Sequence, residues 1–168
     1  IDVSVQEAIA HSLQNAIQVW DLERRVSVRG GEGTRDATED IFRCRDGYVF
    51  LAAPPGLGVS FRALLAFMEE RGHAPVSRLR EERWTDLSFR TGAEAKAIFR
   101  EVFEAFAAGL SKDELTREAI ARKIVLGPVA RVCELPEDEQ LVHRAFFLRL
   151  PGRDGSAPDI FPGAPYAF

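Results

Sequence analysis

The chain has 168 residues, of which 46% are hydrophobic, so it is long and apolar enough to bury one sizeable core. Its formal charge is -4, from 22 basic and 26 acidic residues mixed along the chain, which argues against a surface that follows nucleic-acid phosphates. No stretch approaches the ~18 apolar residues that span a bilayer, and no export signal precedes Ile1. We therefore expect a soluble cytoplasmic protein in which two lone cysteines, Cys44 and Cys133, are reduced and buried.

The first predicted element is an amphipathic helix over residues 5–25. Its apolar residues recur mostly at spacings of three and four, with Gln, Glu and Asn between them. Trp20 is large for a surface position, and we expect it to anchor the helix against another domain or subunit.

Residues 26–40 are polar, glycine-rich and without periodicity, which marks the best candidate domain boundary. Two interpretations of Gly30, Gly31 and Gly33 remain open. In the first, these glycines belong to a hinge linker. In the second, they form a mobile loop that closes over a bound thioester, a role that needs backbone freedom and close approach to the ligand.

A β-hairpin is predicted over residues 41–53. Two β-rich runs, residues 41–44 and 48–53, flank Asp46-Gly47, a dipeptide that favours a tight hairpin turn. The second run is almost entirely apolar, so we expect it to be buried on both faces.

Three helices are predicted after the hairpin. The first covers residues 60–71 and ends at Gly72, and the second covers residues 93–108. The third runs to residue 122 from a capping box, in which Ser111 accepts from the third helical amide and Glu114 bonds back to the Ser111 amide. The charged stretch at residues 75–91 is expected to be irregular.

The remaining predicted elements are short. They are a buried strand over residues 123–126 that Gly127-Pro128 break, a helix over residues 136–142 and a strand over residues 146–150. The tail from Pro151 holds four prolines and three glycines, so it is predicted to be an extended linker.

No pattern in the sequence identifies an active site. His11, His73 and His143 are scattered, without a pair at metal-ligand spacing, so no metal site is expected. Gly56-Leu57-Gly58 lacks the third glycine and the Lys-Ser/Thr of phosphate-binding loops. No serine lies in a nucleophile elbow, and no two carboxylates stand out as a general acid/base couple.

Six short motifs nevertheless occur in a characteristic order: Ile1-Asp2-Val3-Ser4 with Glu7-Ala8, Cys44-Arg45-Asp46-Gly47-Tyr48-Val49, Ser111 with Glu114-Leu115, Leu126-Gly127-Pro128-Val129 with Glu134-Leu135, Gln140-Leu141 with Arg144, and Pro162-Gly163-Ala164-Pro165-Tyr166. This order resembles the family III CoA-transferases (CaiB/BaiF type), the group that includes formyl-CoA transferase and α-methylacyl-CoA racemase. The resemblance covers nearly the whole chain, although Glu137-Asp138-Glu139 replaces the usual Asp-Pro.

The resemblance implies an α+β fold, in which a small domain with a short antiparallel sheet and packed helices is flanked by parts of a Rossmann-like large domain. Residues 1–37 would hold a long large-domain helix and the glycine-rich linker, residues 38–135 the small domain, and residues 136–168 an extended return linker. Family members form interlocked homodimers. Their catalytic Asp, which forms aspartyl-CoA anhydrides, precedes the helix motif that begins here at Ile1, so no residue of this chain is expected to be catalytic.

The leading functional prediction is therefore part of a CoA-transferase that moves CoA between carboxylic acids. Its substrates would be an acyl-CoA and a carboxylic acid, with no tightly bound cofactor, and this piece would supply the small domain and a lid at Gly30, Gly31 and Gly33. Alone it is expected to be inactive, because the catalytic Asp lies upstream. The alternatives are a 2-methylacyl-CoA racemase of the same family and a non-catalytic interaction module.

Overall fold

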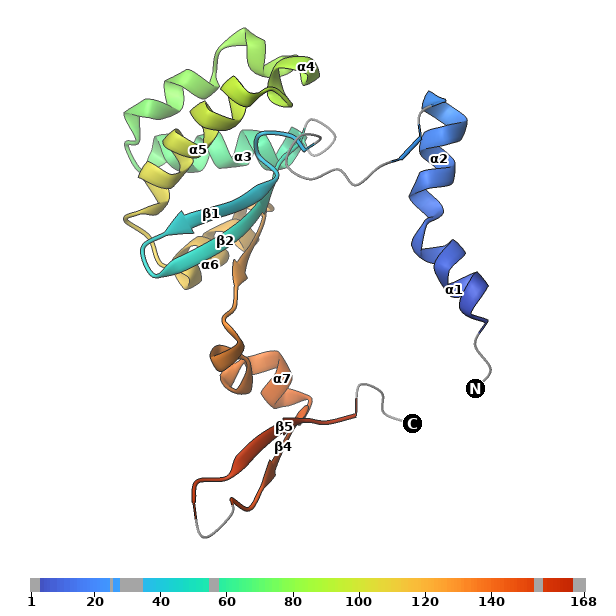
Figure 1. The fold of residues 1–168 in the computed structure, drawn as a ribbon. Coiled ribbons are helices and arrows are strands. Elements are labelled where there is room, and N and C mark those ends of the chain that lie inside the picture. Colours follow the sequence, from blue (N-terminus) through green and yellow to red (C-terminus); the bar gives the residue numbers. More distant parts are fainter. Residues whose placement is uncertain (1–3, 25, 28–34, 55–57, 153–155, 165–168) are drawn as a thin grey trace.

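A computed structural model describes residues 4–24, 26–27, 35–54, 58–152 and 156–164 (Figure 1). They form three parts. The helical arm comprises α1 (Val5–Ser12) and α2 (Gln14–Glu23), the compact domain comprises residues 35–129, and the tail unit comprises residues 132–164. This is an α+β architecture with a short antiparallel sheet, as predicted.

The sheet of the compact domain has the strand order β1-β2-β3, with both pairs antiparallel. Strand β1 (Asp40–Cys44) and strand β2 (Gly47–Ala52) form the predicted hairpin, and Cys44 pairs with Gly47 across the turn. Strand β3 (Val125–Val129) runs through Gly127 and Pro128, so the prediction that these two residues end it was wrong. Because β3 lies at the edge of the sheet, a proline can occupy it without removing a central ladder hydrogen bond.

In the described part of the chain, helices cover one face of the sheet and leave the other open. Phe42, Val49 and Leu51 point to that face and are 0–1% exposed, whereas Tyr48 and Phe50 on the other face are 52% and 37% exposed. The prediction that β2 is buried on both faces was therefore wrong. A continuous apolar run is typical of a strand that is buried on both faces. Here, however, one core forms between the sheet and three helices, α3 (Gly58–Glu70), α5 (Ala93–Ala107) and α6 (Lys112–Arg122).

Aromatic rings fill the centre of that core. The Phe42 ring lies edge-on to Phe103 at 5.1 Å and to Phe99 at 5.4 Å, and Phe99 and Phe103 are stacked. The Phe67 ring meets Phe106 edge-on at 5.0 Å. These edge-to-face and stacked pairs join strand β1 to helices α3 and α5 and add to the hydrophobic stabilisation of the domain.

The stretch predicted to be irregular is ordered into short helices. It contains the 3₁₀-helices η3 (Ala74–Leu79) and η4 (Glu82–Thr85) and helix α4 (Leu87–Arg90). Val76, Leu79 and Trp84 are buried in the core, whereas Leu87 in the same stretch is 59% exposed. The sequence did not reveal these short helices, because a helical period of buried residues can be recognised only over longer elements.

The capping box of α6 is present as predicted. The Ser111 hydroxyl accepts from the Glu114 amide at 3.1 Å, and the Glu114 carboxylate accepts from the Ser111 amide at 2.8 Å. Replacing Ser111 by alanine should lower the free energy of unfolding by about 1 kcal/mol, because the capped amide loses its acceptor. Urea titration of Ser111→Ala beside Ser111→Asp, which keeps a capping oxygen, tests this. Equal stability of the two variants would contradict it.

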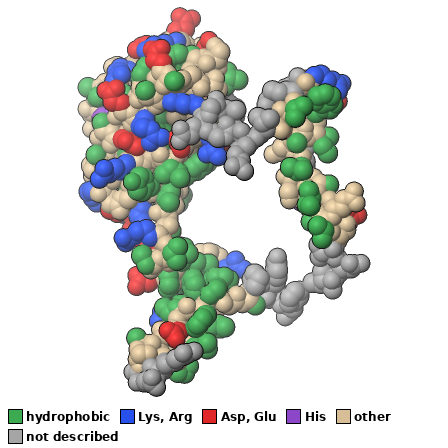
Figure 2. All heavy atoms as spheres, viewed as in Figure 1, with side chains coloured by type: hydrophobic (Ala, Val, Ile, Leu, Met, Phe, Trp, Pro, Cys, Tyr) green, Lys and Arg blue, Asp and Glu red, His purple; other side chains and the backbone are tan. Residues whose placement is uncertain are grey.

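The helical arm differs from the single predicted helix, because α1 and α2 meet at Leu13, whose φ of -102° and ψ of 13° interrupt the helix. Its large apolar side chains are exposed along its length (Figure 2): Val5, Ile9, Leu13, Ile17, Trp20 and Leu22. Whether Trp20 anchors the arm to a further domain or subunit stays a prediction.

The tail unit is more structured than the extended linker that was predicted. It begins with η5 (Val132–Glu137) and α7 (Glu139–His143), and strand β4 (Phe147–Leu150) pairs with β5 (Asp159–Pro162) in an antiparallel ladder. Prolines occupy an end of a two-stranded ribbon without disrupting it, so their number did not exclude a strand. Cys133 is exposed here, contrary to prediction, whereas Cys44 is buried as predicted.

Candidate functional site

The predicted lid residues Gly30, Gly31 and Gly33 lie outside the described residues. The described chain resumes at Arg35, and the residues that follow it are held by a buried charged cluster that the sequence analysis missed. We define this arginine cluster as Arg90, Asp36, Thr38 and the backbone of Ala53.

The arginine cluster is built on a two-point ion pair. The Arg90 guanidinium donates from Nε to one carboxylate oxygen of Asp36 at 2.6 Å and from Nη2 to the other at 2.9 Å. Arg90 is 1% exposed and Asp36 is 6% exposed. A planar guanidinium matches a carboxylate in this arrangement, which a lysine could not reproduce.

Thr38, Ala53 and the Trp84 carbonyl, which accepts from Arg90 Nη1 at 3.4 Å, supply the other hydrogen bonds of the cluster. Asp36 Oδ1 accepts from both the amide and the hydroxyl of Thr38, and the Thr38 hydroxyl oxygen accepts from the Ala53 amide at 3.2 Å. Arg90 Nη2 also donates to the Ala53 carbonyl at 2.8 Å. No buried side-chain nitrogen or oxygen in the described part of the chain lacks a partner, so the buried charges are compensated. The cluster thus ties the chain before β1 to the chain after β2 and to α4.

Aromatic rings cover the Arg90 guanidinium. The Arg90 guanidinium carbon lies 4.4 Å from the centre of the Phe61 ring and 5.8 Å from that of Trp84. Trp84 is itself fixed, because its indole nitrogen donates to the Arg78 carbonyl at 2.8 Å. These cation–π contacts add to the ion pair at a guanidinium that is almost completely buried.

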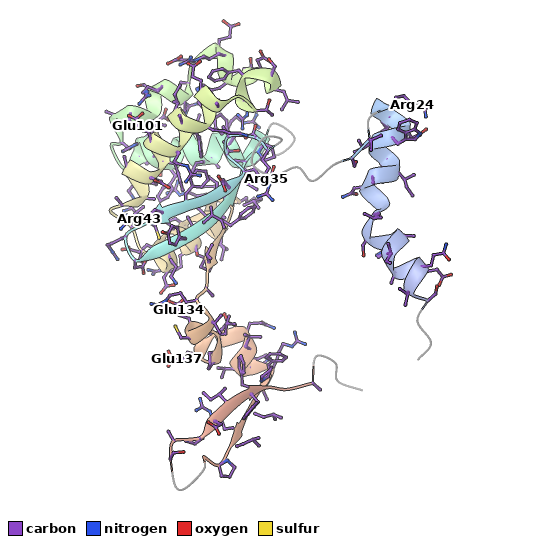
Figure 3. All side chains as sticks on the ribbon, viewed as in Figure 1. Arg24, Arg35, Arg43, Glu101, Glu134 and Glu137 are labelled. Atoms are coloured by element: carbon purple, nitrogen blue, oxygen red, sulfur yellow. The ribbon has the colours of Figure 1, made fainter. Side chains whose placement is uncertain are left out.

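A cavity of about 400 Å³ opens beside the cluster, at the side of the domain where Arg35 lies (Figure 3). Its charged lining consists of three basic residues, Arg35, Lys96 and Arg100, and three acidic residues, Asp36, Glu39 and Asp40. Arg100 donates to Asp40 at 2.6 Å and to Glu104 at 2.9 Å, and Asp36 is held by Arg90. The opposite charges balance, so the cavity does not select strongly for an anion or a cation.

The other candidate groups of the described chain are structural or exposed. Burial raises the pKa of the Cys44 thiol above its ordinary value, which keeps it protonated and poorly nucleophilic. His73 bonds the Val102 carbonyl through Nε2 at 3.0 Å, whereas His11 and His143 are exposed. The buried Ser60 hydroxyl accepts from the Val125 amide at 3.1 Å and donates to the Ala52 carbonyl at 3.4 Å, so it is occupied inside the domain. Within residues 4–24, 35–54, 58–152 and 156–164, no three His, Cys, Asp or Glu side chains are grouped to hold a metal ion.

An ion pair connects the tail unit to the compact domain. Lys112 Nζ donates to Glu134 Oε2 at 2.7 Å, and Glu134 also accepts from the Arg131 amide at 2.9 Å and from Arg131 Nε at 2.8 Å. The hydrogen bond from Lys112 has the largest effect on the pKa of Glu134. Together with the bonds from Arg131, it lowers this pKa from its ordinary value to about 2. The carboxylate is therefore ionised throughout the physiological range.

The depressed pKa of Glu134 predicts a pH dependence. Since the folded form holds its proton less tightly than the unfolded form, Glu134 stabilises the fold fully above its ordinary pKa of 4.5 and loses this effect as pH falls toward 2. The difference in unfolding free energy between the parent and Glu134→Gln should therefore shrink as pH falls through this window. Urea titrations between pH 6 and about pH 2 measure it, and a difference that grows on acidification would contradict the assignment.

No helix among the described residues is both long and apolar enough to cross a membrane. The arginine cluster holds the segments around the hairpin in place, and the cavity beside it carries balanced charge.

Three comparisons place this architecture among known proteins. The family model described as CoA-transferase family III matches residues 1–168. The chain is 33% identical over 170 residues to a protein of Thauera aromatica named succinyl-CoA:(R)-benzylsuccinate CoA-transferase subunit BbsE, and it covers 41% of that protein.

Two solved structures have a similar fold. A CaiB/BaiF family protein from Brucella suis aligns over 99% of this chain and 44% of its own, with a TM-score of 0.57 and 18% identity. Rv3272 from Mycobacterium tuberculosis aligns over 96% of this chain and 47% of its own, with a TM-score of 0.56 and 14% identity. The chain thus spans less than half the length of each of these proteins.

Proposed function

Because the chain belongs to CoA-transferase family III, we propose that the protein of which it forms part or all transfers coenzyme A between two carboxylic acids. The observation that carries the proposal is the 33% identity, across the whole of this chain, to a protein named as a CoA-transferase subunit. An acyl-CoA thioester and a free carboxylic acid would be the substrates, so coenzyme A enters and leaves with each turnover and is not a tightly bound cofactor.

The proposed chemistry uses an aspartate as nucleophile, as the family resemblance implies. The aspartate attacks the thioester carbonyl, the C–S bond breaks, and an anhydride forms while CoA leaves as a thiolate. The thiolate then attacks the aspartyl carbonyl, which releases the donor acid, and the acceptor carboxylate repeats the sequence in reverse. We assign the nucleophile to none of the residues of this chain. Their proposed role is to supply the small domain, residues 38–135, that helps to close the site.

The proposal is tested by assaying the full-length protein with succinyl-CoA and a panel of carboxylic acids that includes (R)-benzylsuccinate. Chromatography should show a new acyl-CoA and an equal amount of succinate. A racemase would instead exchange the 2-hydrogen of a 2-methylacyl-CoA with deuterium from solvent, without any acceptor acid. A non-catalytic interaction module would neither bind nor convert an acyl-CoA. Either of these results, without CoA transfer, would overturn the proposal.

We also propose that Gly30, Gly31 and Gly33 act as the lid. An anhydride reacts readily with water, so a site that forms one has to be sealed during turnover. Replacing the three glycines together by alanine should raise thioester hydrolysis relative to transfer, because alanine restricts the backbone. The ratio of free CoA to new acyl-CoA measures this effect. An unchanged ratio would contradict the lid proposal and leave the transferase proposal intact.

The proposed partner is a second subunit that covers the helical arm. Six large apolar side chains on the arm are exposed, and such a continuous stripe is typical of an interface. The family resemblance favours an interlocked homodimer, whereas the name of the Thauera aromatica relative describes a subunit. Replacing Ile17, which is 67% exposed, by aspartate should shift the assembly toward monomers in native mass spectrometry. The control Gln18→Asp changes an exposed polar neighbour and should leave assembly intact, so equal effects of the two would contradict the interface.

A further inference from the structure

The tail unit is joined to the compact domain through a narrow neck at Ala130 and Arg131 (Figure 1). Strand β3 ends just before this neck, and η5 begins just after it. Inside the tail unit, β4 pairs with β5, and the amides of Phe146 and Gly163 bond carbonyls of the same unit. The unit therefore holds its own shape and depends on other contacts for its orientation.

Among the described residues, one ion pair is the sole hydrogen bond or salt bridge between residues 132–164 and the compact domain. It joins Lys112 Nζ to Glu134 Oε2 at 2.7 Å. The hydrophobic core of the domain does not extend across the neck, since its buried cluster ends at Ile124. Rotation about the neck is therefore opposed mainly by this pair.

Both residues of the pair make further hydrogen bonds. The Lys112 side chain is only 14% exposed, and its backbone amide donates to the Asp46 carboxylate at 2.8 Å, which fixes the start of α6 against the β1–β2 turn. On the other side, Glu134 is clamped by the amide and Nε of Arg131. An ion pair whose residues make further hydrogen bonds costs less side-chain entropy to form than an isolated exposed pair.

We infer that Lys112 and Glu134 form a clamp that sets the orientation of the tail unit relative to the compact domain, with Ala130 and Arg131 as the hinge. Breaking the clamp leaves both parts folded and frees the tail unit to swing about the neck. The hinge is a conformational device separate from the chemistry of CoA transfer, and it holds whether or not the proposed transferase activity is correct.

Electron–electron distance measurements between spin labels on the full chain test the clamp. The labels are attached at Ala121→Cys on α6 and Gln140→Cys on α7, in a Cys133→Ser background, and the labelled protein is diluted with unlabelled protein. The distance between the two labels changes with the orientation of the tail unit relative to the compact domain. The starting protein should give one narrow distance. Lys112→Met keeps the length of the side chain and removes the charge, and it should replace this narrow distance by a broad distribution.

The matched control is Glu101→Gln. Glu101 pairs with Arg78 at 2.9 Å within the compact domain, away from the neck (Figure 3), so the narrow distance should persist. If Lys112→Met destabilises the compact domain itself, Glu134→Ala provides the same comparison from a residue outside that domain. An unchanged narrow distance in both Lys112→Met and Glu134→Ala would overturn the inference and show that packing at the neck fixes the orientation.

Discussion

Replacing Arg90 by methionine should lower the free energy of unfolding by about 3–5 kcal/mol, because it breaks a buried ion pair. The change removes both bonds to the Asp36 carboxylate and the bond to the Ala53 carbonyl. Asp36 would then remain buried with only Thr38 as a hydrogen-bond donor, and an unpaired buried carboxylate is costly. Urea or thermal denaturation followed by circular dichroism measures the loss.

Two comparisons separate this cause from loss of packing. Arg80 makes a similar two-point pair with Glu69, but that pair is exposed on the surface, so Arg80→Met should cost about 1 kcal/mol or less. The double variant Arg90→Met/Asp36→Asn also removes the unpaired negative charge at position 36 and keeps an oxygen that accepts from the Thr38 amide. It should therefore be more stable than Arg90→Met alone. A double variant that is as unstable as the single one, or an Arg80 effect equal to that of Arg90, would contradict the buried ion pair as the cause.

Replacing Phe103 by alanine should cost about 3–5 kcal/mol, because the change leaves a cavity at the centre of the core. Phe103 is fully buried, and its ring lies at 5.1 Å from that of Phe42 and at 5.8 Å from that of Phe99. The variant therefore loses both buried area and favourable ring–ring contacts. The loss should appear as a lower urea midpoint with an unchanged slope, since the unfolded state exposes a similar surface.

The control for Phe103 is Ile120→Ala on helix α6. Ile120 is also a large apolar residue in a helix, but it is 71% exposed, so its loss should change the free energy of unfolding by no more than about 0.5 kcal/mol. A small effect at Phe103, or an effect at Ile120 of similar size, would contradict the position of the core.

The parts of the fold that the sequence predicted are those determined by neighbouring residues. The β1–β2 hairpin follows from Asp46-Gly47 between two β-rich runs, and the capping box of α6 follows from Ser111 and Glu114, three residues apart. The family assignment drew on motifs spread over the whole chain, and the matching family model confirms it.

The features that the sequence did not predict depend on residues that meet only in three dimensions. Arg90 and Asp36 are 54 positions apart, and Arg90 stands in a charged stretch where nothing marks it as the one arginine that turns inward. The edge position of β3 decides whether Pro128 can continue a strand, and edge position is a property of the sheet. The candidate lid, Gly30 to Gly33, lies outside the described residues, so its role stays a prediction.

The two tryptophans of the chain lie in opposite surroundings, and this provides two optical reporters in one molecule. Trp84 is 3% exposed and packs against Phe89 and the Arg90 guanidinium, whereas Trp20 on the helical arm is 52% exposed. Emission from Trp84 should be shifted to the blue and should follow unfolding of the compact domain. Emission from Trp20 should be red-shifted and accessible to iodide while the arm is uncovered, and it should lose that accessibility when another surface covers the arm. Phenylalanine at either position isolates the other signal, so folding of the domain and burial of the arm can be followed separately in the same titration.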